Sequence, residues 1–329
     1  MKYRLLFLHL FMITAVISAQ TGNYKLLKRF AVPGDGSWDY LTLDSGARRL
    51  YVSHGTRVEV LSADTGEKIG IIPNTPGVHG IALAGAYGFT TNGKSNTSTM
   101  FDTKTLAVRK TIRTGEGPDA VLYDPGSKRV FTFNGEGNDA TAIDSLTGDV
   151  AGKVALGGAP ESGVSDGKGT VFVNLEDKNQ VTVFDSRKLG VLHHWPVAGC
   201  RQPVSMTMDV AHERLFIGCR SKVMVVMNAM NGKVVATVPI GDHVDASAFD
   251  PATSLLYESN GDGTLTIIHQ DSVDQYRVIQ TVQTQPGAKT MAYDPKSREV
   301  FLSVADYGPS HAVASGTFKV LVMGPAPTR

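Results

Sequence analysis

Residues 120–134 read AVLYDPGSKRVFTFN, and this stretch decides the fold. An apolar run ends in Asp-Pro, a short polar turn follows, and a second apolar run comes after the turn. Because Asp-Pro is typical of the opening of a type I turn, the stretch predicts two antiparallel strands joined by that turn. Four further copies recur along the chain: AFDPATSLLY at 248–257, AYDPKSREVF at 292–301, and the looser LTLDSGARRLYV at 41–52 and MTMDVAHERLFI at 206–217.

Two more elements follow this hairpin in a fixed order. One is an alternating apolar strand, as in VEVL at 58–61, VTVF at 181–184 and LTII at 265–268. The other is a Thr-Gly or Asn-Gly turn, as at 65–66, 147–148 and 231–232, before another alternating strand. Each repeat therefore predicts four antiparallel strands. A unit of this kind has two faces that it cannot bury alone, and radial stacking against neighbouring units buries both.

One position in each repeat, two residues before the apolar part of the first strand, gives the register. We call these seven positions the mouth ring: Asp39, His79, Asp119, Glu161, Val204, Asp245 and Lys289. The steps between them are 40, 40, 42, 43, 41 and 44 residues, without a long interruption. This spacing predicts an all-β, seven-bladed β-propeller that forms a single domain over residues 20–329.

The closure of the propeller can also be predicted. The last repeat ends with its third strand at 318–322, and no fourth strand follows it. Residues 24–32 have the fourth-strand pattern at the other end of the chain. We therefore expect the N-terminal strand to complete the last blade and to remove the open sheet edge.

The first 19 residues have the pattern of a secretory signal peptide. Lys2 and Arg4 precede an apolar run at 5–17, and Ala19 supplies the small residue of a cleavage site. The run is too short to favour a membrane-spanning helix, so we expect no transmembrane segment after cleavage. The alternative is an uncleaved membrane anchor. The segment predicts a periplasmic or secreted protein.

The repeats resemble the YVTN β-propeller family, whose signature is a strand ending in Tyr-Val-Thr-Asn. Here the signature takes the forms LYVSH at 50–54, FTTN at 89–92, FTFN at 131–134 and LYESN at 256–260. Blades four, five and seven depart from it, with FVN at 172–174, FIGC at 216–219 and FLS at 301–303. The resemblance implies an exported β-propeller that binds a ligand or a partner, and it implies no particular ligand.

The mouth ring carries most of the candidate site. In a propeller the first residues of the innermost strands border the central channel, so these positions converge on one mouth. His54 at the end of a second strand and His311 in the long loop 306–317 are expected on the same face. The candidate ligand-binding residues are Asp39, His54, His79, Asp119, Glu161, Asp245, Lys289 and His311.

Four histidines of consecutive blades are candidates for a metal site: His54, His79, His243 and His311. Imidazole with carboxylate suits Zn²⁺, Cu²⁺ or Fe²⁺, so the cofactor to expect, if there is one, is a divalent metal ion. The structural alternative is that these carboxylates only accept hydrogen bonds from loop amides. We expect surface roles for His193, His194 and His212, which fall on an outer strand or on the opposite face.

The two cysteines both fall in the fifth repeat. Cys200 precedes its first strand, and the hairpin register places Cys219 opposite Val204, on the same face as Cys200. A disulfide is one interpretation in an exported protein, and buried free thiols or metal ligation are the alternatives.

Two functions follow from these observations. The first is a non-catalytic binding or scaffold protein, expected to be a monomer, with a small molecule, metal ion or protein at the mouth. The second is a metal-dependent lyase or hydrolase of lactonase type that uses the same histidines and carboxylates. Nucleic acid is not expected as a partner, because the chain has 32 basic and 31 acidic residues and no basic-aromatic stripe.

The signal peptide generates a first prediction. When the full chain is expressed in a Gram-negative host, we expect the protein to be exported and to begin at Gln20. N-terminal sequencing and the intact mass of the periplasmic fraction check this. A cytoplasmic protein that retains Met1 would contradict the prediction.

Overall fold

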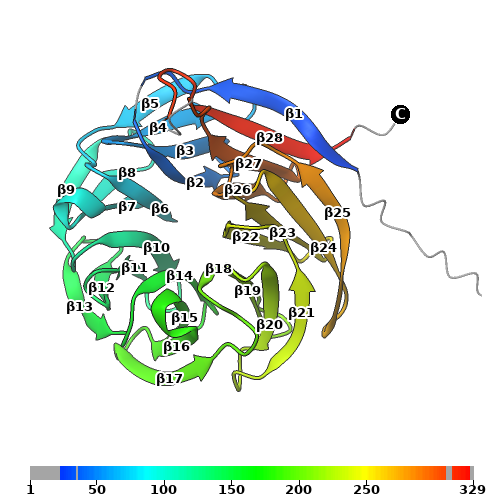
Figure 1. Cartoon of the computed structure of the whole chain (residues 1–329). Coiled ribbons are helices and arrows are strands. Elements are labelled where there is room, and N and C mark those ends of the chain that lie inside the picture. Colours follow the sequence, from blue (N-terminus) through cyan, green and yellow to red (C-terminus); the bar gives the residue numbers. More distant parts are fainter. Residues whose placement is uncertain (1–22, 35, 309–312, 327–329) are drawn as a thin grey trace, which may run out of the picture.

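The computed structural model describes residues 23–34, 36–308 and 313–326. Within these residues it contains seven four-stranded antiparallel sheets arranged around a central axis, as Figure 1 shows. The predicted seven-bladed all-β propeller is therefore confirmed. The predicted signal peptide lies outside the described residues. No helix in the described ranges is both long and apolar enough to cross a membrane.

The innermost strands line the axis and begin on one face of the ring. They are β2 (Trp38–Asp44), β6 (Val78–Ala84), β10 (Pro118–Asp124), β14 (Pro160–Ser165), β18 (Pro203–Asp209), β22 (Val244–Asp250) and β26 (Met291–Asp294). The second strands run back toward that face. They are β3 (Arg49–His54), β7 (Tyr87–Asn92), β11 (Arg129–Asn134), β15 (Thr170–Leu175), β19 (Arg214–Cys219), β23 (Leu255–Asn260) and β27 (Glu299–Val304).

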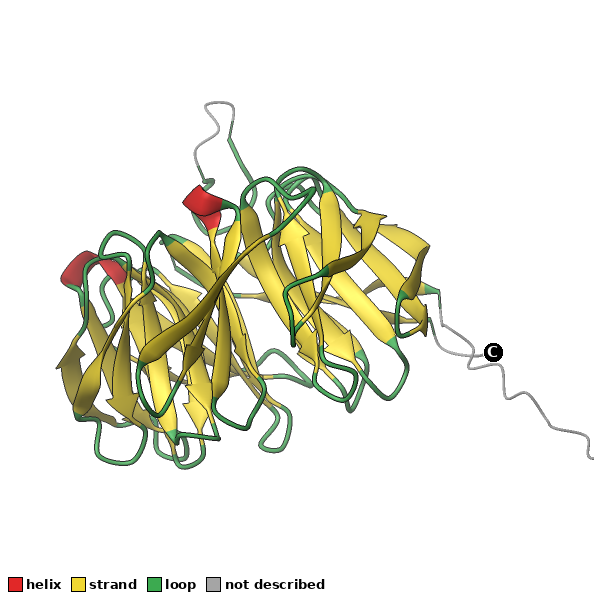
Figure 2. Ribbon diagram, turned by 90° about the horizontal axis from the view of Figure 1, so that it is seen from below, coloured by secondary structure: helices red, strands yellow, loops and turns green. Residues whose placement is uncertain are grey.

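The third strands are as deeply buried as the second. They are β4 (Arg57–Ser62), β8 (Thr97–Asp102), β12 (Asp139–Asp144), β16 (Gln180–Asp185), β20 (Val223–Asn228), β24 (Thr264–Ser272) and β28 (Lys319–Pro325). The outer strands are mostly exposed. They are β5 (Lys68–Ile72), β9 (Val108–Arg113), β13 (Val150–Ala155), β17 (Gly190–Pro196), β21 (Val234–Pro239), β25 (Gln275–Gln283) and β1 (Tyr24–Ala31). Two short 3₁₀ helices, η1 (Gly93–Ser95) and η2 (Glu176–Lys178), lie on one face of the ring (Figure 2).

The N-terminal strand closes the propeller, as predicted. β1 pairs with β28 along its length, from Tyr24 opposite Pro325 to Ala31 opposite Lys319. In Figure 1 the blue β1 lies beside the red β28, so the two ends of the chain meet in blade seven. The Tyr24 hydroxyl also lies 2.7 Å from the Tyr257 hydroxyl of blade six. The closing strand therefore joins two blades.

The hydrophobic core lies between the blades. One cluster combines Tyr51 and Val60 of blade one with Ile81 and Phe101 of blade two. The rings of Tyr51 and Phe101 are 5.7 Å apart across this boundary. Each sheet has apolar side chains on both of its faces. Stacking covers one face with the preceding sheet and the other face with the following sheet. Each core cluster among the described residues spans two neighbouring blades, so every blade depends on its neighbours for burial.

The aspartates of the Asp-Pro turns also connect neighbouring blades. Asp124 of blade three accepts hydrogen bonds from Ser165 (2.5 Å) and Ser186 (2.5 Å) of blade four. Asp294 of blade seven accepts hydrogen bonds from Ser45 (2.6 Å) and Arg48 (2.5 Å) of blade one. The motif thus has a second role that its turn chemistry does not reveal.

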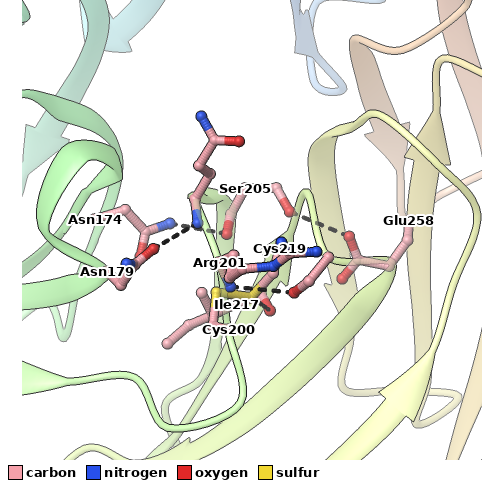
Figure 3. Close-up of a disulfide and its surroundings, with 10 residues drawn as sticks. Asn174, Asn179, Cys200, Arg201, Ser205, Ile217, Cys219 and Glu258 are labelled. Atoms are coloured by element: carbon pink, nitrogen blue, oxygen red, sulfur yellow. Dashed lines mark hydrogen bonds between the residues drawn. A yellow bond between two sulfur atoms is a disulfide. The ribbon is translucent and has the colours of Figure 1, made fainter.

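Figure 3 shows a buried polar chain across blades four, five and six. Asn174 donates from its amide to the Ser205 carbonyl (3.0 Å), and the Ser205 hydroxyl donates to the Glu258 carboxylate (3.2 Å). Glu258 is fully buried, and its other oxygen has no hydrogen-bond partner in the described part of the chain. Burial raises the pKa of Glu258 to about 8, although the Ser205 hydrogen bond opposes the rise.

This carboxyl generates a prediction about pH. In the unfolded chain Glu258 loses its proton near pH 4.5, whereas in the folded chain it keeps the proton up to about pH 8. The raised pKa therefore costs stability progressively as the pH rises between these values. We expect Glu258→Gln to be more stable than the wild type at pH 8.5, by up to about 5 kcal/mol, with the difference shrinking toward pH 4.5. Urea denaturation at several pH values measures this, and a pH-independent difference would contradict it.

Cys200 and Cys219 form a disulfide in the structure, with Cα atoms 5.6 Å apart (Figure 3). The register differs by one residue from the sequence-based expectation. Cys219 pairs opposite Pro203, because a bulge leaves Val204 outside the ladder. Both cysteines are buried, and the loops that follow them carry Arg201 and Arg220.

The disulfide generates a further prediction. It closes a loop with a sequence separation of 19, so a Cys200→Ala, Cys219→Ala variant should lose about 3 kcal/mol of stability. Alkylation of the denatured wild type without reductant should leave the intact mass unchanged. Two alkylated thiols in that sample would show that the bond is not formed.

Candidate functional site

The mouth ring lies on a repeated β-bulge. In blade one Trp38 pairs with His54 and the next pair is Leu41 with Val52, so two residues oppose Ser53 alone. Equivalent register shifts occur at the start of β6, β10, β14, β18 and β22. In each of these strands the ring residue directly follows the first paired residue. A bulge turns its side chain away from the regular pleat, and here six bulges bring side chains to one channel mouth.

Hydroxyl groups of the preceding blade hold the ring backbone. Asp39 accepts hydrogen bonds at its carbonyl from Thr290 (2.7 Å) and Ser303 (2.9 Å) of blade seven. Thr91 donates to the Asp119 carbonyl, Ser162 to that of Val204, and Ser259 to that of Lys289. The bulged carbonyls are therefore satisfied by the neighbouring blade, which fixes the direction of each ring side chain.

Three ring residues of blades one to three form one cluster. His79 Nδ1 lies 2.6 Å from Asp39 Oδ2 and 3.5 Å from Asp119 Oδ1. The hydrogen bond with Asp39 raises the pKa of His79 above its ordinary value. Burial and the charge of Asp39 raise the pKa of Asp119 to about 6. One imidazole nitrogen thus faces two carboxylates at the mouth.

A second cluster lies on blades five to seven. The Asp245 carboxylate is 2.6 Å from Lys289 Nζ and 3.1 Å from Arg220 Nη2. Burial raises the pKa of Asp245, and these two cations oppose the rise. Two positive groups therefore share one buried carboxylate on the side of the mouth opposite the first cluster.

Tyr40 lies one residue further along β2, between the two clusters. Its hydroxyl donates to the Asp245 carbonyl of β22 (3.3 Å), although blade seven separates the two strands around the ring. Burial raises the pKa of Tyr40 well above its ordinary value, and the charges of Asp245, Glu161, Asp39 and Asp119 add to this effect. Tyr40 therefore lies close to ring residues of both clusters. Its sequence position gave no indication of this role.

Two depressions open from the mouth. One, of about 470 Å³, is lined by ring residues and by Lys94, Glu136 and Glu176 from the loops after the second strands. The other, of about 440 Å³, shares Glu176 and is lined by Arg201, Gln202 and Arg220. Burial, followed by the charges of Asp119 and Asp245, raises the pKa of Glu161 to about 9, so it is protonated at neutral pH.

Of the eight predicted ligand-binding residues, the structure brings six together: Asp39, His79, Asp119, Glu161, Asp245 and Lys289. His54 is completely buried, and its Nδ1 accepts a hydrogen bond from Arg57 (3.1 Å) because a guanidinium can only donate. Its ring packs on Phe318 at 4.8 Å. His54 is thus part of the packing between blades one and seven, and His311 lies outside the described residues.

The four candidate metal-ligating histidines do not form one site in the described ranges. His243 has a left-handed backbone (φ 58°), and its exposed ring lies 3.2 Å from Asp242. The one group in the described ranges with ligand atoms within 4.8 Å of one another is Asp39, His79 and Asp119. Among the described residues, the candidate set of metal ligands is therefore one histidine, His79, and the two carboxylates of Asp39 and Asp119.

Comparison with known proteins identifies the fold, but it identifies neither a family nor a function. No family model and no curated protein matches the sequence, so the resemblance to the YVTN family stays a prediction. A chain from the crystal structure of a mitotic checkpoint complex is similar with a TM-score of 0.77 and 14% identity, over 98% of this chain and 99% of that chain.

Two other solved structures give the same result. A chain of hydrazine synthase from Kuenenia stuttgartiensis has a TM-score of 0.72 and 17% identity, over 86% of this chain and 95% of that one. The structure of U3-55K has a TM-score of 0.75 and 11% identity, over 92% and 98%. Identities this low show the shared propeller alone.

The Asp245 cluster generates a prediction. Asp245→Ala would leave Arg220 and Lys289 without their shared carboxylate, and we expect a loss of about 2 kcal/mol of stability in urea denaturation. Adding Lys289→Met should recover part of the loss. Asp149→Ala is the control, because its pair with Lys110 is exposed on both sides (71% and 40%) and its removal should have a much smaller effect. Equal losses in the two single variants would contradict the assignment.

Proposed function

We propose that the chain is an exported binding protein that holds a small polar molecule at the mouth of the propeller. The observation that carries the proposal is that six ionisable ring residues lie close together around Tyr40, next to two open depressions. The signal peptide pattern and the disulfide support export.

The state of Glu161 supports a ligand site over a purely structural ring. No hydrogen bond or ion pair to Glu161 occurs among the described residues, although its pKa is raised to about 9. The Glu161 side chain is partly exposed and lines the depression of about 470 Å³, and titratable groups with strongly shifted pKa values gather at functional sites. The structural interpretation of the ring, in which every carboxylate caps a loop amide, does not account for Glu161.

The charge distribution favours a ligand with a carboxylate group. Arg201 and Arg220 line the second depression, and Arg201 has no ion pair within the described ranges. A guanidinium group presents a planar fork of donors that matches a carboxylate. The acidic residues of blades one to four face the other end of such a ligand.

The experiment uses the full chain after its own processing. A panel of small mono- and dicarboxylic acids is screened by thermal shift in EDTA, and hits are measured by isothermal titration calorimetry. We expect Arg201→Gln and Arg220→Gln each to weaken binding by about tenfold or more. Arg277→Gln, on the exposed outer strand β25, is the matched control. Absence of any hit, or unchanged affinity in both mouth variants, would overturn the proposal.

The second candidate function is a metal-dependent lyase or hydrolase. It is favoured by the contact of His79 with two carboxylates beside an open depression, because such a group can move a proton at a bound substrate. The test is turnover of lactones and esters with and without added Zn²⁺, followed by acid release. Activity that requires the metal and disappears in His79→Gln would support it, and no turnover would exclude these substrates.

A further inference from the structure

We propose that Asp39, His79 and Asp119 bind one divalent transition-metal ion at the mouth. The inference rests on the proposed function, because it places the ion beside the depression where the polar ligand would lie. It goes beyond that function by assigning the class of ion and its three protein ligands.

The spacing of the three ligand atoms fits a single ion. His79 Nδ1 is 2.6 Å from Asp39 Oδ2 and 3.5 Å from Asp119 Oδ1, and all three atoms lie within 4.8 Å of one another. Ligands about 2.0–2.2 Å from a tetrahedral ion are separated by roughly 3.3 Å. Small side-chain rotations therefore suffice to surround an ion, with no movement of the strands.

The ligand types indicate which ions the group selects. One imidazole nitrogen with two carboxylate oxygens suits Zn²⁺, Co²⁺ or Fe²⁺ better than Ca²⁺ or Mg²⁺, which prefer oxygen ligands alone. Three protein ligands leave at least one coordination position open, whereas structural zinc sites have four protein ligands. The open position would face the depression of about 470 Å³ that His79 and Asp119 line.

The three ligands come from equivalent bulges of three consecutive blades and are held before any ion binds. Ser53 accepts a hydrogen bond from the Asp39 amide (2.7 Å), while two hydroxyls of blade seven hold the Asp39 carbonyl. Thr91 accepts from the Gly80 amide (2.8 Å) and donates to the Asp119 carbonyl, so one side chain links the carriers of two ligands. These hydrogen bonds fix the backbone of the residues that carry the three ligands.

A separate observation points to a missing positive partner. Asp119 Oδ1 has almost no accessible surface and no hydrogen bond from any described residue. A buried carboxylate oxygen in this position costs stability unless it is paired or coordinates a metal. His79 Nδ1 lies 3.5 Å from this oxygen, beyond ordinary hydrogen-bond length, and is held closer to Asp39, while the rest of the Asp119 side chain is 37% exposed. An ion between the three side chains would satisfy this oxygen.

The experiment titrates untagged, EDTA-treated protein with Co²⁺ and Zn²⁺. The background variant is His193→Ala, His194→Ala, because these adjacent histidines on the exposed strand β17 could bind metal at the surface. We expect one ion per chain by calorimetry, with Co²⁺ absorption bands in the visible range. In that background His79→Gln and Asp119→Asn should each weaken binding by about tenfold or more.

The matched control is His243→Gln, which removes an exposed imidazole at the same mouth and should leave affinity unchanged. Thermal unfolding of each metal-free variant shows whether it is folded. If the background variant binds no ion, or if folded His79→Gln binds as well as its parent, the proposal is wrong. The carboxylate screen is done in EDTA, so its failure and the failure of metal binding are separate results.

Discussion

The β-bulge at the start of the inner strands is the constraint on which the site depends. A regular strand would alternate its side chains between the two neighbouring blades, and none would point consistently into the channel. The extra residue redirects one side chain per blade, and its freed carbonyl needs a donor. Hydroxyls of the preceding blade supply that donor at Asp39, Asp119 and Val204, and Ser259 does the same for Lys289, which precedes β26 without a bulge. The geometry of the mouth is thus a consequence of how blades stack.

Polar contacts between blades occur on both faces of the ring. On the mouth face, threonine and serine hydroxyls reach the bulges of the next blade. On the opposite face, turn aspartates such as Asp124 and Asp294 reach the next blade through serine and arginine side chains. Apolar stacking alone is insensitive to small sliding movements, whereas these hydrogen bonds require one register. They make the seven sheets a rigid frame for the ring.

The repeat period made the fold and most of the ring predictable, because equal spacing places equivalent residues at equivalent positions in space. The repeat period could not predict contacts between residues of different repeats. Tyr40 reads in the sequence as an ordinary apolar residue of an inner strand, and its role depends on a bulge that shifts it toward Asp245. His54 was expected at the mouth, but Arg57 of blade one and Phe318 of blade seven enclose it between the two blades. Lys94 and Glu176 were missed because their loops belong to the mouth only once the blades are stacked.

The ring also explains how one fold can carry different side chains at the mouth. Hydroxyls of neighbouring residues, and not the ring side chains themselves, hold the backbone of Asp39, Asp119 and Val204. Val204 occupies the same bulge as five ionisable residues, and its carbonyl accepts the same kind of hydrogen bond. The backbone therefore tolerates acidic, basic and apolar side chains at one position. The chemistry of the mouth can therefore change while the frame stays the same: the fold fixes where the seven ring side chains meet, and their identities set the chemistry of that surface.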